Sequence, residues 1–158
     1  MISEILAYTN KYFPYTAEYN TFSVVADGIE GTFNETYLVG QYISILDSFL
    51  NDGVYKITGV TNTKLTLDAA LLAESSKLCI HGLKLPKAYL SVISAIETYT
   101  AGQSTQAEIS SESQGSRSVT YKDGSGWQSA FKSKLSPYMS MFDDRRNFIE
   151  YDINTKGW

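Results

Sequence analysis

The middle of the chain, residues 16–84, most constrains the fold, because short β-rich runs alternate there with strong turn signals. The tripeptide NDG at 51–53 is typical of a tight turn, and TNT at 61–63 separates the two arms of a predicted hairpin. Closing such strands into a small antiparallel barrel or rolled sheet removes exposed strand edges. We predict five strands, at 21–25, 37–46, 54–60, 64–67 and 78–81, with 68–77 as a loop containing a helical turn.

Helical patterns flank this β-rich middle. Residues 2–13 carry apolar side chains at helical spacing up to Pro14, which breaks a helix. A second stripe begins after Pro86, a favoured first helical residue, and ends at Gly102, a predicted C-cap. We therefore predict an α+β fold in which a small helical domain of about three helices, residues 1–15 and 85–142, is interrupted by an inserted antiparallel β-barrel module at 16–84.

A third helix follows a polar arm. Residues 103–123 are rich in Ser, Gln and Gly and indicate an exposed arm or loose hairpin. Trp127, Phe131 and Leu135 then recur every four residues, after a capping box at 125–128 and before the helix-breaking Pro137. A helix of about three turns is too small to bury these side chains alone. It must dock on the rest of the chain or on a neighbouring subunit.

The last residues, 143–158, are predicted to form an interaction tail. From Phe148 to Ile153, apolar and acidic residues alternate as in a strand with one apolar face, which completes a local sheet or extends a neighbour's sheet. Arg145 and Arg146 pair with the preceding aspartates or contact an acidic partner, and the sequence leaves both options open. Trp158 ends a polar segment, which favours an interface anchor.

Charge and composition exclude several functional classes. The formal net charge is −4, and no region is strongly basic, so specific binding to nucleic acid is not expected. A single cysteine, Cys79, rules out an intramolecular disulfide and fits a reducing cytoplasm. Because we find no signal peptide and no apolar run long enough to cross a bilayer, we expect a soluble protein.

Candidate chemistry is sparse. Cys79 and His81 would share one face of a strand, where a thiolate–imidazole pair is conceivable, but a buried structural pair is the favoured interpretation. Two such ligands do not make a zinc site, and Gly124 and Gly126 lack the Lys-Ser/Thr of a phosphate loop. The carboxylates have no spacing that predicts a paired-acid site: Asp27, Glu30, Glu35, Asp143 and Asp144. We expect no enzymatic activity, no metal and no cofactor.

Residues 86–142 resemble the head–tail connector (adaptor) proteins of tailed bacteriophages. The resemblance rests on a helix, then the arm SSESQGSRSVTY, then a Trp/Leu helix ending in KLSPYM. The positions that match the family pattern are Glu112, Ser113, Gly115, Ser118, Tyr121, Leu135 and Tyr138. The strands at 16–84 depart from the purely helical members and look like small β-barrels inserted in other phage structural proteins.

This resemblance implies a structural protein of the virion neck, made in the bacterial host cytoplasm. Adaptors form a ring under the portal protein, usually of twelve copies, and link the DNA-filled head to stopper or tail proteins. DNA passes through the ring without specific binding, and residues 143–158 would reach into the portal or the next ring. The predicted interface residues are Arg117, Tyr121, Trp127, Phe131, Leu135, Tyr138, Arg145, Arg146, Phe148, Tyr151 and Trp158.

Other functions remain open at this point. The chain could also be a stopper or tail-completion protein of the same neck. The inserted β module departs from the family pattern, so the resemblance does not decide between these positions. Alternatively, it could be a stand-alone β-barrel that binds a peptide or glycan through Tyr42, Tyr55 and their neighbours. A Cys79/His81 enzyme is the least favoured alternative, and it requires a reactive thiol.

Overall fold

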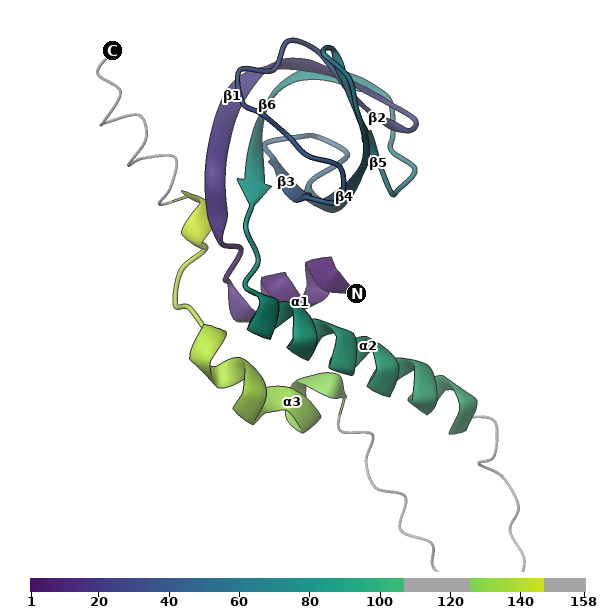
Figure 1. The fold of residues 1–158 in the computed structure, drawn as a ribbon, viewed down its shortest axis with the longest axis vertical. Coiled ribbons are helices and arrows are strands. Elements are labelled where there is room, and N and C mark those ends of the chain that lie inside the picture. The colour runs from purple at the N-terminus through teal and green to yellow at the C-terminus, as the bar shows by residue number, and fades with distance from the viewer. Residues whose placement is uncertain (107–125, 147–158) are drawn as a thin grey trace, which may run out of the picture. The chain divides into compact units, whose positions relative to one another are not determined.

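The computed structural model describes residues 1–106 and 126–146 of the chain (Figure 1). Among the described residues, its contacts divide the chain into two units, which are described separately: residues 2–85 with 140–146, and residues 86–106 and 126–139 with Met1. The fold is α+β, as predicted. The described elements are α1 (Ile2–Thr9), β1 (Pro14–Val25), β2 (Gly28–Glu30), β3 (Tyr42–Leu46), β4 (Gly53–Val60), β5 (Lys64–Leu67), β6 (Glu74–Leu83), α2 (Lys87–Gln106), α3 (Trp127–Leu135) and the 3-10 turn η2 (Ser136–Tyr138).

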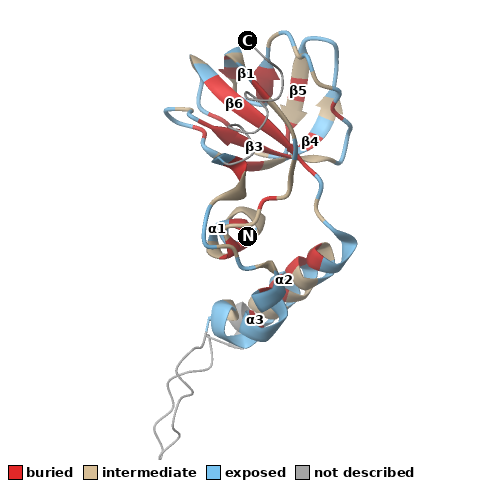
Figure 2. Cartoon of the chain, turned by 90° about the vertical axis from the view of Figure 1, so that its left-hand side faces the viewer, coloured by how far each residue is buried: buried red, intermediate tan, exposed pale blue. Residues whose placement is uncertain are grey.

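All six strands pair in antiparallel fashion, in the order β1-β2-β5-β4-β3-β6, and β6 pairs back to β1 to close the ring (Figure 1). Every strand contributes buried apolar side chains to one shared core, and buried positions concentrate on the strands in Figure 2. The core includes Phe22, Val24, Ile29, Ile43, Ile45, Ile57, Leu65, Leu67, Leu78 and Ile80.

The prediction of five strands was incomplete. The short strand β2 was missed, and β1 and β6 are longer than predicted, whereas β3 begins only at Tyr42 within the predicted 37–46. Residues 74–77 belong to β6, so the predicted helical turn in 68–77 is wrong. These residues are all polar, and none of them is buried. They form a strand because they pair with β1. Gly28 lies so close to β5 that a Cβ there would be 2.0 Å from the carbonyl oxygen of Leu65.

The first helix is shorter than the predicted 2–13. It ends at Thr9 because Asn10 and Phe13 take positive φ angles of 51° and 56°, which no helix continues through. The Ser3 hydroxyl exchanges hydrogen bonds with the backbone of Val54 at 3.1 and 3.2 Å, so α1 is bonded to β4. By contacts, α1 groups with the strands, whereas the sequence grouped residues 1–15 with 85–142. The functional division into domains stays a prediction.

The helical unit contains α2, α3 and η2. Helix α2 starts after Pro86, as predicted, but continues through Gly102 to Gln106, so the predicted C-cap is wrong. Helix α3 ends at Leu135, before Pro137, as predicted. Its N-cap is Gly126, which has no side chain to cap with, while Ser125 of the expected capping box lies outside the described residues.

Candidate interaction surface

The predicted interface residues of α3 pack largely inside the helical unit. Leu135 is fully buried and Phe131 nearly so, with the Phe131 ring in an edge contact with Tyr99 at 5.6 Å. Tyr138 meets the ring of Tyr89 at 4.6 Å and is half-buried, as is Trp127. The helix therefore docks on its own chain, which was one of the two options the sequence allowed. Trp127 and Tyr138 keep exposed surface for a partner.

The chain after η2 returns to the first unit and forms a clasp, which we define as residues 140–146. The Asp144 carboxylate accepts hydrogen bonds from the backbone N–H groups of Tyr12 and Phe13, at 2.8 and 3.1 Å. It also lies 3.2 Å from the Lys11 ammonium. A bulky residue with positive φ, such as Phe13, is strained, and two charge-assisted hydrogen bonds offset that strain. The clasp thus holds the α1–β1 junction in its unusual conformation.

Arg145 occupies the centre of the clasp. Its Nε and Nη2 donate to the Asp143 carboxylate, with Nη2 at 2.6 Å from Oδ2, and Nη1 donates to the buried Ser44 hydroxyl at 2.6 Å. The guanidinium carbon lies 3.5 Å from the centre of the Tyr12 ring, a close cation–π contact. Arg145 is 8% exposed, so its donors are used within the chain.

In this structure Arg145 is used for packing within its own chain, and its role at an interface stays a prediction. Of the two options left open by the sequence, local pairing with Asp143 is the one observed. Arg146 beside it is exposed and stays an interface prediction. The other predicted interface residues lie outside the described residues: Arg117, Tyr121, Phe148, Tyr151 and Trp158.

Cys79 and His81 lie side by side, as the strand spacing predicted, with the sulfur 3.9 Å from both ring nitrogens. Burial raises the pKa of the Cys79 thiol to about 12, with contributions from the charges of Asp47 and Glu18. Burial also lowers the pKa of His81 to about 4, helped by the positive charge of Arg145. The thiol is thus protonated and the imidazole neutral at pH 7, which is the reverse of an activated nucleophile.

Exposed apolar side chains mark a surface that the sequence analysis did not identify. Phe49 is 88% exposed and Leu50 56%, both in the loop between β3 and β4, and Leu72 in the β5–β6 loop is 61% exposed. We call these three residues the apolar tip. Large apolar side chains held in solvent are typical of interaction sites. The available signal was the pair Phe49-Leu50 directly before the NDG turn, where a surface loop is usually polar.

A hydrogen-bond network fixes the two loops of the tip to each other. The Asn51 amide donates to the Leu72 carbonyl and to the Glu74 carboxylate, both at 2.8 Å, and accepts from the Leu72 N–H at 2.9 Å. Glu74 also accepts from the Ser48 hydroxyl and from the Phe49 N–H. Burial opposes the charge of Glu74, but these hydrogen bonds outweigh burial and lower the pKa of Glu74 below its usual value. The two loops of the tip are therefore bonded to each other.

Replacing Asn51 with Ala should destabilise the protein by about 2 kcal/mol, because Asn51 is buried and its side chain makes three hydrogen bonds to Leu72 and Glu74 that alanine cannot make. The midpoint of urea denaturation measures this loss. Asn62→Ala, in the exposed β4–β5 turn, is the matched control and should change the free energy of unfolding by less than about 0.5 kcal/mol. Equal midpoints for both variants would contradict the proposed role of the network.

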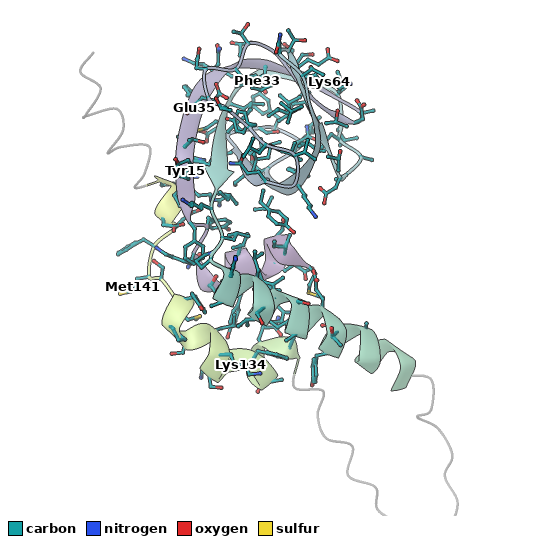
Figure 3. The ribbon with its side chains drawn as sticks, in the orientation of Figure 1. Tyr15, Phe33, Glu35, Lys64, Lys134 and Met141 are labelled. Atoms are coloured by element: carbon teal, nitrogen blue, oxygen red, sulfur yellow. The ribbon has the colours of Figure 1, made fainter. Side chains whose placement is uncertain are left out.

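Other exposed apolar residues include Leu38 and Val39, before β3, and Met141 and Phe142 within the clasp. Met141, labelled in Figure 3, is 89% exposed. Within residues 1–106 and 126–146, no three His, Cys, Asp or Glu side chains are grouped as a metal site would require. Nor does any helix in this part of the chain have the length and apolar character needed to span a membrane. Comparisons with protein-family models, curated proteins and solved structures found no match to this chain.

Proposed function

We propose that this protein is a head–tail connector (adaptor) of a tailed bacteriophage, which forms a ring under the portal and joins the DNA-filled capsid to the tail. In this proposal the ring of strands is a small β-barrel inserted into the connector. Its partners are the portal protein, neighbouring copies of the chain and the stopper or tail proteins. The chain acts structurally, through surfaces, and is a component of the virion neck.

The observation that carries this proposal is the apolar tip. Phe49, Leu50 and Leu72 are more than half exposed, and the loops that carry them are tied together by the Asn51 network. Loops that are already bonded to each other lose less backbone entropy on binding, and aromatic and aliphatic side chains exposed on them can serve as anchors at a protein interface. The resemblance of residues 86–142 to phage adaptors gives the class of partner.

The apolar tip provides a direct test. The native mass of the purified chain should be measured alone and after mixing with the portal ring of the same phage. We expect Phe49→Ser/Leu50→Ser to weaken assembly about thirtyfold, as for the loss of an interface hot spot. Val60→Ser is a matched control, because Val60 is an exposed apolar residue at the other end of β4. If both variants assembled with the portal equally well, the apolar tip would not be part of the interface.

A truncation that tests the tail must leave the clasp, residues 140–146, intact. A chain that ends before Asp143 loses the contacts of Asp144 and Arg145, so its failure to assemble would reflect a damaged fold. A chain that ends after Arg146 keeps the clasp and tests the tail alone. Under the proposal, the wild-type chain binds the portal in a fixed stoichiometry, and the chain ending after Arg146 binds it less tightly. A stable monomer that does not bind the portal would favour a stopper or tail-completion protein instead.

The alternative of a stand-alone binding module receives less support from the residues predicted for it. The Tyr55 hydroxyl donates to the Asn51 carbonyl at 3.0 Å, and its ring packs on the core, so Tyr55 serves the tip loop. Tyr42 is half-buried, with the Lys56 ammonium 6.0 Å from its ring centre. Neither arrangement favours a ligand over internal packing.

A further inference from the structure

The two loops that carry the apolar tip contain charge of one sign only. The β3–β4 loop, DSFLND at 47–52, begins and ends with an aspartate and has no lysine, arginine or histidine. The β5–β6 loop, DAALLA at 68–73, adds Asp68 and again has no basic residue. Asp47, Asp52 and Asp68 are all exposed. The tip therefore presents apolar side chains together with carboxylates on the same two loops.

These three carboxylates have no cationic partner in the part of the chain that the structure describes. Within residues 1–106 and 126–146, no lysine, arginine or histidine lies within salt-bridge distance of Asp47, Asp52 or Asp68. Asp52 and Asp68 do accept backbone hydrogen bonds, from the N–H groups of Ser48 and Lys56 at 2.9 and 2.8 Å. These bonds position the carboxylates and leave their charge to be met by a partner.

The exposure of Phe49 indicates the shape that a partner needs. The side chain is 88% exposed, so it becomes buried only when a partner surrounds it. Aromatic anchors of this kind contribute most to binding when they fill a desolvated pocket on the other protein. Leu50 and Leu72, both more than half exposed, extend the apolar contact beside Phe49. The tip therefore fits an apolar pocket better than a flat surface.

The carboxylates indicate the charge around that pocket. Asp47 and Asp52 lie at its rim when Phe49 enters it, because they begin and end the loop that carries Phe49. A carboxylate that loses water without gaining a partner weakens binding, whereas a lysine or arginine opposite it attracts and orients the tip. An anionic membrane surface does not fit, because its head groups repel carboxylates. Charge complementarity therefore favours a protein with basic residues around the pocket.

We propose that the apolar tip binds a protein pocket that is apolar inside and has lysine or arginine at its rim. Phe49 fills the pocket, and Asp47 and Asp52 face the basic rim. This inference rests on the proposed function for the identity of the partner, which makes the pocket a part of the portal ring. It adds the chemistry by which the partner recognises the tip.

Binding of the full-length chain to the immobilised portal ring of the same phage tests the rim at about 20 mM and about 500 mM sodium chloride. Asp47→Asn/Asp52→Asn removes both charges. Asparagine tolerates the φ of 63° at position 47, and at position 52 its amide oxygen keeps the hydrogen bond from Ser48. We expect about tenfold weaker binding than wild type at low salt. At high salt both should bind within about twofold of each other, because salt screens the attraction.

Two further variants separate the rim from other effects. Glu4→Gln/Glu97→Gln is the matched control, because it removes the same number of charges at exposed positions of α1 and α2. It should bind as the wild type does at both salt concentrations. Phe49→Ser/Leu50→Ser should lose about thirtyfold at both concentrations, because salt does not screen the apolar contact.

The outcomes distinguish this inference from the proposed function. Wild-type binding that is unaffected by Asp47→Asn/Asp52→Asn would overturn the basic rim and leave the proposed function in place. An equal loss in the control variant would show a general effect of net charge and would also overturn the rim. A wild-type chain that does not bind the portal would contradict the proposed function and this inference together. Sedimentation of the chain with phosphatidylglycerol vesicles would assign the tip to a membrane and overturn the protein pocket.

Discussion

Replacing Arg145 with Met is expected to destabilise the first unit by about 3 kcal/mol, as for a buried ion pair that loses one partner. The guanidinium pairs with Asp143, donates to Ser44 and stacks on Tyr12. Methionine fills similar space but leaves the Asp143 carboxylate without its cation and the fully buried Ser44 hydroxyl without its donor. Urea denaturation followed by circular dichroism gives the free energy of unfolding.

Arg146→Met is the matched control, because this arginine is the exposed chain neighbour. Its effect should stay within about 0.5 kcal/mol, as for most surface substitutions. If Arg145→Met proved as stable as Arg146→Met, the clasp would not contribute to folding. The same pair of variants separates folding from assembly, because Arg146→Met tests a surface contact in a stable protein.

The second large effect is a loss of stability on mild acidification, caused by His81. Burial, helped by the charge of Arg145, lowers the pKa of His81 to about 4 in the folded protein, whereas an unfolded histidine titrates near 6.5. Between these pH values the unfolded chain binds a proton that the folded chain does not. The free energy of unfolding therefore falls as the pH falls through this window, by about 2 kcal/mol from pH 7 to pH 5.

His81 is the only histidine in the sequence, so this window carries a single histidine titration. His81→Gln should be nearly flat in stability from pH 7 to pH 5, whatever its absolute stability. Denaturation midpoints at pH 7, 6 and 5 for both proteins make the comparison. Parallel slopes would show that His81 does not carry the pH dependence. At lower pH, Asp143 adds a loss of its own: burial opposes its charge, but hydrogen bonds from Arg145 outweigh burial and lower its pKa, and this stabilisation disappears when the carboxylate is protonated.

The clasp also bears on how the chain works in an assembly. Because residues 140–146 are bonded to the α1–β1 junction, the tail leaves the first unit from a fixed point. A binding segment with a fixed origin loses less entropy on binding than one on a free linker. Under the proposed function, the first unit and the tail would therefore act together, and the clasp would set where the tail meets its partner.

The sequence by itself determined the class of fold and most of its elements. Alternating β-rich runs and the turns at 51–53 and 61–63 gave β4 and β5 close to their observed bounds and part of β1, β3 and β6, and Pro86 and Pro137 marked the start of α2 and the end of α3. These signals are local, because turn residues and prolines restrict their own backbone. The face shared by Cys79 and His81 also followed from strand spacing alone.

Tertiary structure decided what depended on distant partners. Strand β2 has three residues and exists because β1 and β5 pair with it, and β6 extends through polar residues because β1 lies beside them. Arg145 is buried by its contacts with Tyr12 and Ser44. These partners are about a hundred or more residues away in sequence, so no local pattern predicts the burial. The loop that carries the exposed Phe49 side chain is held by hydrogen bonds of Glu74 to the Phe49 N–H and to the Asn51 side chain. A sequence shows which side chains are apolar or charged, but only folding decides which of them find a partner.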